Sequence, residues 1–206
     1  NIEVHERLFP LLVHSWRAHW NRPRLPFLFV QLSSLNRATW PAFRDSQRRL
    51  SREIPFTAMA VSSDVGDSLD VHPRQKRPVG QRLARLALHD VYGCKQMTPA
   101  GPMAERAVRD ERSVTVFFHW ADSLHTSDGC PPRTFELAGE DGVFHPAQAC
   151  PRGSTIWVHA PEVPHPMWVR YGWQPFTRAN LVNKDGLPAS TFQISVETPA
   201  DSASAL

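Results

Sequence analysis

The chain has 206 residues, of which 41% are hydrophobic and 21% charged, with a formal net charge of +3. This length fits one large domain or two small ones, and the composition excludes a disordered chain, a coiled coil and a collagen-like fibre. The longest apolar run, residues 26–30, is far shorter than the roughly 20 residues of a spanning helix, so no membrane segment is expected.

The charge is distributed unevenly along the chain. Residues 1–112 hold 18 Lys and Arg against 11 Asp and Glu, net +7, whereas residues 113–206 hold 5 against 9, net −4. This difference suggests two structural units. The basic residues do not cluster with aromatic residues as they do on a nucleic-acid-binding surface, so no nucleic-acid partner is expected.

The first half of the sequence alternates helical and extended patterns. Leu8, Leu12, Trp16 and Trp20 recur at i, i+4 spacing and predict an N-terminal helix with one apolar stripe. Phe9 and Val13 lie beside this stripe. The Asn21-Arg22-Pro23 stretch ends the helix.

Two buried strands follow, each separated from the next element by a loop. Residues 27–32 and 57–62 are continuous apolar segments, typical of strands buried on both faces of a parallel sheet. Residues 40–54 between them are predicted to be helical, and a third helix begins at Pro78 and runs to about Tyr92. Strands separated by helical crossovers predict a parallel, doubly wound α/β sheet over residues 1–97.

In the second half the apolar residues alternate with polar ones, which is typical of strands exposed on one face. We predict an antiparallel β unit over residues 98–197 and a flexible tail over 198–206. Its strands are expected at residues 114–118, 134–137, 143–146, 155–158, 168–171 and 192–196.

The cysteines and histidines indicate no metal centre. The three cysteines form no CxxC pair, and both a Cys130–Cys150 bridge and three free thiols remain open. The ten histidines are scattered without metal-ligand spacing. Neither a metal nor another cofactor is expected.

Candidate catalytic groups concentrate in residues 62–73, SSDVGDSLDVHP, between a buried strand and the next helix. This places His72 and the carboxylates Asp64, Asp67 and Asp70 at the carboxyl end of a parallel strand, where open α/β sheets bind ligands. A neutral imidazole oriented by a carboxylate is the usual base for a serine hydroxyl. The alternative is a polar loop with capping aspartates and an ordinary surface histidine.

Three motifs resemble the sialate O-acetylesterase family of the SGNH hydrolase superfamily. Residues 62–84, SSDVGDSLDVHPRQKRPVGQRLA, are similar to its histidine block, and FVQL with WPAFRDSQ to a strand and following helix. VRYGW and GLPAS resemble its closing β segment. The resemblance covers residues 1–192 and implies the C-terminal half of a flavodoxin-like parallel sheet, followed by a small antiparallel β unit.

The resemblance implies hydrolysis of an acetyl ester on a sugar, with O-acetylated sialic acid as the typical substrate. By motif match His72 is the base, and its orienting acid is Asp70, Asp67 or a backbone carbonyl. The nucleophilic serine is expected on a segment or subunit N-terminal to Asn1, so this chain alone is expected to be inactive. Ser68 belongs to a GDSL sequence, but the family's nucleophile block lies far upstream of the histidine block.

Three further residues are candidates for substrate binding. Gln31 and Gln47 are polar at positions expected to be buried, which indicates either a structural network or the active-site wall. Arg74 follows the catalytic histidine closely and is expected either to bind a substrate carboxylate or to pair with an Asp.

Two alternative functions remain open. One is an acetylxylan-type polysaccharide deacetylase of the same superfamily. The other is an inactive fragment or carbohydrate-binding module, in which Trp157, Trp168 and Trp173 stack on sugar rings. Family analogy implies a location outside the cytoplasm, in the periplasm, secretions or lysosome.

Overall fold

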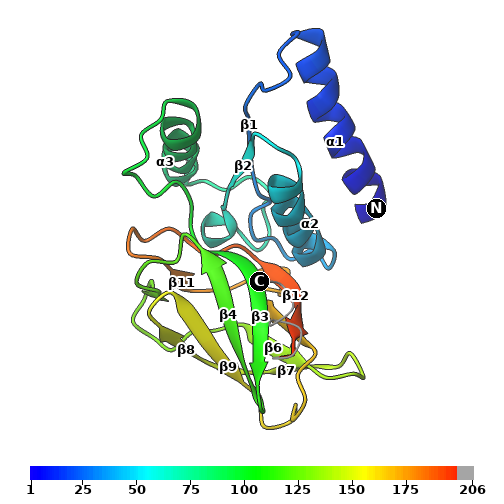
Figure 1. Ribbon diagram of the computed structural model, residues 1–206, viewed down its shortest axis with the longest axis vertical. Coiled ribbons are helices and arrows are strands. Elements are labelled where there is room, and N and C mark those ends of the chain that lie inside the picture. The colour runs from blue at the N-terminus through cyan, green and yellow to red at the C-terminus, as the bar shows by residue number, and fades with distance from the viewer. Residues whose placement is uncertain (199–206) are drawn as a thin grey trace.

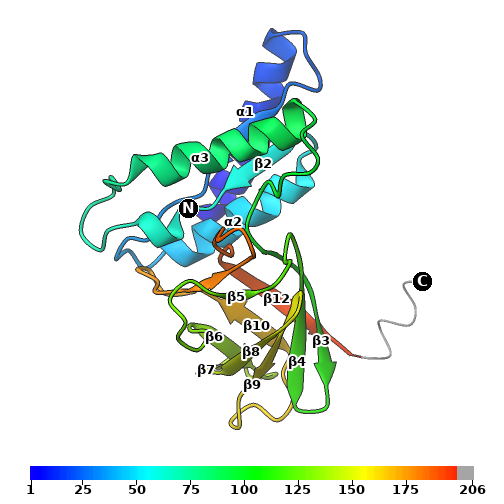
Figure 2. The ribbon, with the colours of Figure 1, turned by 90° about the vertical axis from the view of Figure 1, so that its left-hand side faces the viewer.

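A computed structural model describes residues 1–198 and shows a mixed α/β molecule (Figures 1 and 2). Residues 199–206 of the predicted tail lie outside the described residues. We call the segment from α1 to η2 the α/β part and the segment from β3 to β12 the β part. The α/β part contains α1 (Ile2–His19), β1 (Phe27–Val30), α2 (Trp40–Glu53), β2 (Thr57–Ala60), η1 (Ser63–Val65), α3 (Lys76–Leu86) and the π-helical turn η2 (Ala87–Val91).

The predicted parallel pairing of the first two strands is confirmed. β1 and β2 pair in parallel, with Phe27 opposite Thr57 and Val30 opposite Ala60. Helices α1 and α2 lie on one side of these strands and α3 on the other (Figure 1). This arrangement follows from right-handed crossovers, and it places the chain segments that leave both strands at the same edge of the sheet.

Helix α1 presents apolar side chains on two faces. The side that packs on this chain holds Val13, which is fully buried, and Phe9, whose ring lies 4.9 Å from that of Phe29. The four residues of the predicted stripe are each 46–66% exposed, and of these the Trp16 ring also contacts Phe27 of β1, with ring centroids 6.1 Å apart. The i, i+4 pattern therefore located the helix but did not identify the face that packs on the strands.

The β part forms one eight-stranded mixed sheet among the described residues, in the order β7-β6-β10-β12-β3-β4-β9-β8. A second, two-stranded sheet pairs β11 with β5. The bounds are β3 (Met103–Asp110), β4 (Ser113–His119), β5 (His125–Thr126), β6 (Phe135–Ala138), β7 (Phe144–Pro146), β8 (Gln148–Arg152), β9 (Thr155–His159), β10 (Trp168–Tyr171), β11 (Leu181–Val182) and β12 (Phe192–Glu197).

The predicted small antiparallel β unit is wrong in size and in one pairing. β12 pairs with β3 in parallel, and β3 and β8 were not predicted. In β3 a register shift between Ala104 and Arg106 interrupts the alternation on which the prediction depended. β8 is polar and contains Pro151, which an edge strand tolerates because one of its sides needs no ladder hydrogen bonds.

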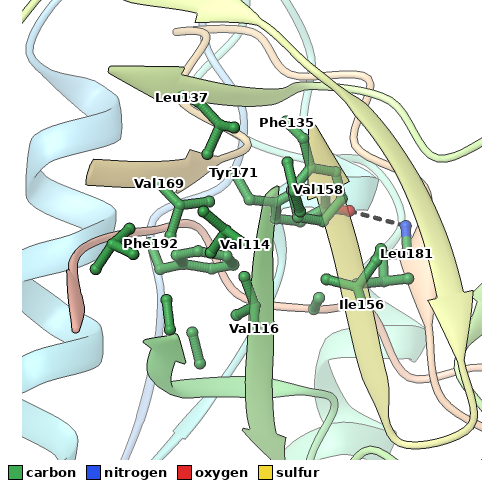
Figure 3. Close-up of a cluster of buried hydrophobic side chains, with 14 of the residues drawn as sticks. Val114, Val116, Phe135, Leu137, Ile156, Val158, Val169, Tyr171, Leu181 and Phe192 are labelled. Carbon is green, nitrogen blue, oxygen red and sulfur yellow. Dashed lines mark hydrogen bonds between the residues drawn. The ribbon is translucent and has the colours of Figure 1, made fainter. Parts of the chain in front are cut away.

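The core of the β part lies where the large sheet curves back on itself. Side chains from β6 and β10 on one flank pack against those from β4 and β9 on the other (Figure 3). At its centre the Tyr171 hydroxyl accepts a hydrogen bond from the Leu181 backbone N–H at 2.8 Å. The buried cluster includes Val114, Val116, Phe135, Leu137, Ile156, Val158, Val169 and Phe192.

The α/β part and the β part are joined by a buried arginine on α2. Arg44 is fully buried and donates to the carbonyl oxygens of Gly172, Gln174 and Pro175 and to Thr191 Oγ1, at 2.6–3.0 Å. Burial lowers the pKa of Arg44 to about 10, so the guanidinium is still charged at neutral pH.

The three cysteines are free thiols, so the considered Cys130–Cys150 bridge does not form. Within residues 1–198, no helix is long and apolar enough to cross a lipid bilayer. The same residues contain no group of three His, Cys, Asp or Glu side chains placed to hold a metal ion.

Candidate active site

The segments that follow β1 and β2 run together at the carboxyl edge of the parallel pair. Ser62 Oγ donates to the Gln31 carbonyl at 2.7 Å, and Ser34 Oγ donates to the Ser63 carbonyl at 2.6 Å. The serine side chains are short and buried, so they fix one segment to the other without water between them. We call this carboxyl edge of the β1–β2 pair the rim, and it carries the candidate catalytic residues.

Gly66 allows the loop after β2 to approach the loop after β1. A Cβ atom at this position would lie 2.3 Å from the Ser34 carbonyl oxygen and 2.5 Å from its nitrogen. Two residues further, the Ser68 carbonyl accepts a hydrogen bond from the Asn36 N–H at 3.2 Å. The backbone leading to His72 is therefore held by close packing that only glycine permits.

Two consecutive aspartate turns then position His72. Asp67 Oδ1 accepts from the N–H groups of Leu69 and Asp70 at 2.8 and 3.2 Å. Asp70 Oδ1 accepts from the His72 N–H at 2.8 Å and lies 3.1 Å from His72 Nδ1. The hydrogen bond from the His72 amide, followed by that from its ring, lowers the pKa of the Asp70 carboxyl.

The His72 ring is accessible to a reactant. Its side chain is 83% exposed, and that of Asp70 is 51% exposed. When Nδ1 donates to Asp70, Nε2 carries the free lone pair and can accept a proton. The pair has the local geometry of a general base oriented by a carboxylate.

An ion pair that the sequence did not reveal holds the start of this loop. Arg82 on α3 contacts Asp64 through two hydrogen bonds of 2.6 Å and also donates to the Val61 carbonyl at 2.8 Å. Asp64 is therefore committed to a structural contact. The two residues are separated by most of a loop and a helical turn, so no local spacing indicated the pair.

The side chains of Gln31 and Gln47 form hydrogen bonds to other residues of the chain near the end of β1. Gln31 is 1% exposed, and its Nε2 donates to the Arg44 carbonyl at 2.9 Å and to Ser190 Oγ at 2.8 Å. Gln47 Oε1 accepts from the Leu32 N–H at 2.8 Å. Within residues 1–198, neither side chain is hydrogen-bonded to His72.

Arg74 and Ser68 lie close to His72 in the sequence but differ in exposure. Arg74 is exposed, and its charge makes the smallest contribution to the lowered pKa of Asp70. Ser68 is half-buried. No hydrogen bond joins the Ser68 hydroxyl to the His72 ring in the described part of the chain.

The aromatic residues considered for sugar stacking differ in their surroundings. Trp157 stacks on His159 with ring centroids 5.6 Å apart, and the Arg152 guanidinium lies 5.2 Å from its centroid. Trp173 has the Arg170 guanidinium 5.7 Å from its ring. Trp168 is 40% exposed. The faces of Trp157 are therefore already in contact with protein groups.

Comparison with known proteins identifies similar acetylesterases, although no family model matches the chain. Sialate O-acetylesterases from Homo sapiens and Mus musculus are each 30% identical over 127 residues, covering 52% of this chain and 24% of theirs. A carbohydrate acetylesterase structure from Xanthomonas citri is 35% identical with a TM-score of 0.85, over 92% of this chain and 45% of that chain. The chain thus spans about a quarter of the length of these curated relatives.

Proposed function

The chain is a relative of the sialate O-acetylesterases, and from this premise we propose that it supplies the histidine side of a carbohydrate O-acetylesterase site. The observation that carries the proposal is the Asp70–His72 pair, which lies exposed at the carboxyl rim of a parallel strand pair. Ligand sites of open α/β sheets are found at this edge.

In the proposed reaction a serine hydroxyl attacks the acetyl carbonyl while His72 Nε2 takes its proton. The proton then passes to the departing sugar oxygen, and an acetyl-serine remains. His72 next takes a proton from a water molecule that attacks the acetyl-serine, and it returns this proton to the serine oxygen as the ester bond breaks and acetate leaves. Asp70 orients the ring and stabilises the imidazolium, and Asp67 holds the turn that presents Asp70.

We assign the nucleophilic serine to a polypeptide segment or subunit outside this chain. Ser68 precedes His72 by four residues and shares no hydrogen bond with its ring among residues 1–198. The expectation that this half of the site belongs to a flavodoxin-like sheet is part of the same proposal. The oxyanion-stabilising donors are assigned to that external segment as well.

The substrate assignment is an O-acetylated sugar, with sialic acid as the first candidate. Arg74, exposed two residues after His72, is the proposed contact for its carboxylate. Gln31 and Gln47 are proposed to shape the wall of the site from behind, because their amides hold the backbone that follows β1. By family analogy the protein acts outside the cytoplasm.

A neutral acetylated polysaccharide such as acetylxylan is the second candidate substrate. The observation that favours it is the Xanthomonas enzyme, which is described by the broader class of carbohydrate acetylesterase and matches a larger share of this chain. Acetate release from O-acetylated sialic acid and from acetylated xylan, compared with and without Arg74→Ala, distinguishes the two. If Arg74→Ala loses activity toward O-acetylated sialic acid but keeps it toward acetylated xylan, sialic acid is supported as the substrate.

The central test measures hydrolysis of p-nitrophenyl acetate by this chain alone and by the chain together with a nucleophile-bearing segment. We expect activity only in the second case, and a loss of about 10³-fold or more in His72→Ala. Ser68→Ala is the matched control and should keep full activity. Strong activity of this chain alone that disappears in Ser68→Ala would contradict the assignment of an external serine.

A further inference from the structure

Trp120, which follows β4, has a backbone conformation that is rare for a bulky residue. β4 ends at His119 close to the α/β part, and Trp120 has a φ of 58°, in the left-handed region (Figure 1). Its carbonyl accepts a hydrogen bond from Nδ2 of the fully buried Asn183 at 2.9 Å. Its ring forms a T-shaped contact with His89, with centroids 5.3 Å apart. Such backbone strain persists only where surrounding contacts fix it, and it is often found at ligand sites.

Trp120 is held in place by these contacts, yet it is 43% exposed and lines a cavity of about 460 Å³. We call this space the Trp120 cavity. Its volume lies within the range of roughly 300–1,000 Å³ that is typical of small-molecule sites. A smaller cavity of about 220 Å³ shares His119 and Trp120 with it and is lined by residues of both the α/β part and the β part. The polar residues that line the Trp120 cavity include Lys95, Gln96, Asp122, Ser154 and Lys184.

The charges on the wall of the Trp120 cavity are compensated. Lys184 Nζ lies 2.7 Å from Asp122 Oδ2, and Lys95 Nζ lies 4.0 Å from Asp90 Oδ1. The Gln96 amide adds both a hydrogen-bond donor and an acceptor. An exposed indole beside mixed donors and acceptors, without an excess of one charge, suits a neutral sugar ring. The C–H groups of such a ring stack on the aromatic face while its hydroxyls form hydrogen bonds to the polar groups.

We propose that the Trp120 cavity is an accessory site that binds a sugar unit of a neutral polysaccharide. It lies away from the rim, because Thr57, the first residue of β2, lines the adjoining smaller cavity, whereas His72 follows the opposite end of β2. One unit of a polysaccharide chain can therefore be held at Trp120 while another unit of the same polymer lies at His72. The choice of a polysaccharide as the ligand rests on the proposed function, whose second candidate substrate it favours.

The test measures binding of xylohexaose, an unacetylated neutral oligosaccharide, to the whole chain by isothermal titration calorimetry. The main variant is Trp120→Ala. Trp168→Ala is the matched control, since Trp168 is 40% exposed on β10 and is not among the residues that line the Trp120 cavity. Gln96→Ala changes an exposed residue of the cavity wall without altering the strained position. Circular dichroism shows which variants fold.

We expect the wild type and Trp168→Ala to bind xylohexaose equally, and Trp120→Ala to bind it about ten-fold more weakly, because the stacking surface is lost. The inference is overturned if the wild type does not bind, or if Trp120→Ala binds as well as Trp168→Ala. If Trp120→Ala does not fold, Gln96→Ala decides, and an unchanged affinity in that variant overturns the inference. Tighter binding of sialyllactose than of xylohexaose also overturns it, because the ligand would then be an acidic sugar.

The binding measurement needs no esterase activity, so it separates this inference from the proposed function. His72→Ala should bind xylohexaose as the wild type does. When the nucleophile-bearing segment is present, Trp120→Ala should keep its activity toward p-nitrophenyl acetate and lose activity toward acetylated xylan. Binding of xylohexaose by a protein that hydrolyses neither ester leaves the inference standing and refutes the proposed function. Hydrolysis of both esters without binding of xylohexaose supports the proposed function and overturns the inference.

Discussion

At the scale of single residues, short carboxylates determine where the His72 ring lies. Asp67 closes one turn and Asp70 the next, and only Asp70 reaches the imidazole. A carboxylate two residues before a histidine can accept from both its backbone and its ring, so this orientation needs no distant partner. The arrangement is local, which is why the sequence could indicate it.

The Asp70 carboxyl should titrate below its ordinary pKa of 3.8, because the His72 hydrogen bonds stabilise the ionised form. We expect carbon-detected NMR to show a lowered midpoint that rises only part of the way toward 3.8 in His72→Ala, because the variant loses the ring contact but keeps the larger backbone hydrogen bond. Since the folded-state pKa is depressed, the stabilising contribution is present above 3.8 and is lost as the pH falls through the lowered value. An unchanged midpoint in His72→Ala would contradict the contact.

Other residue contacts could not be anticipated from the sequence. Arg82 pairs with Asp64, and Arg44 crosses to the β part, each joining segments without a fixed spacing. Three of the four groups to which Arg44 donates are backbone carbonyls, which carry no signal in the amino-acid types.

At the scale of elements, prediction succeeded where one face is apolar and the pattern is regular. The strands β4 and β10 lie close to or at the predicted residues. β3 was missed because its buried residues Ala104 and Ala107 are small and a bulge displaces them. Helix α1 was located, but its two apolar faces could not be ranked without knowing what lies beside it.

The loops that follow β1 and β2 approach each other closely at Gly66, so a larger side chain there should destabilise the protein. We expect Gly66→Ala to lower the free energy of unfolding by about 1–3 kcal/mol, because the new methyl group overlaps the Ser34 backbone. Gly80→Ala is the matched control, since nothing lies within 4 Å of its added Cβ in helix α3. It should raise the free energy by about 0.5–1 kcal/mol.

Urea unfolding of the two alanine variants provides the measurement, and the His72 ring signals report the loop itself. They should shift in Gly66→Ala and remain in place in Gly80→Ala. Equal stability of both variants would show that the loop yields at little cost, and that the rim is not held by this contact.

At the scale of the whole molecule, a few buried polar contacts hold the α/β part on the β part. Gln31 bonds to Ser190, Asp45 accepts from the Gln193 N–H, and Arg44 bonds to four groups between residues 172 and 191. The sequence predicted a change of architecture near residue 97. It could not predict this junction, because each contact depends on the final packing of both parts.

Replacing Arg44 should therefore destabilise the protein as a whole. We expect Arg44→Met to cost roughly 3–5 kcal/mol, because it leaves buried carbonyl groups without donors in a site shaped for a charge. Arg112→Met, at an exposed position, should change stability by less than about 0.5 kcal/mol. Urea denaturation measures both, and a small effect for Arg44→Met would mean that water replaces the guanidinium.

The position of β12 has a consequence for how the protein is made. β12, the last strand among residues 1–198, lies between β10 and β3, so it joins the two flanks of the eight-stranded sheet. During translation, the edges of β10 and β3 that pair with β12 stay unpaired until β12 has been synthesised, because its residues near 197 leave the ribosome late. Until then the two flanks of the sheet are not joined by hydrogen bonds, and their open strand edges can pair with other chains. The nascent chain therefore needs chaperones most during this interval.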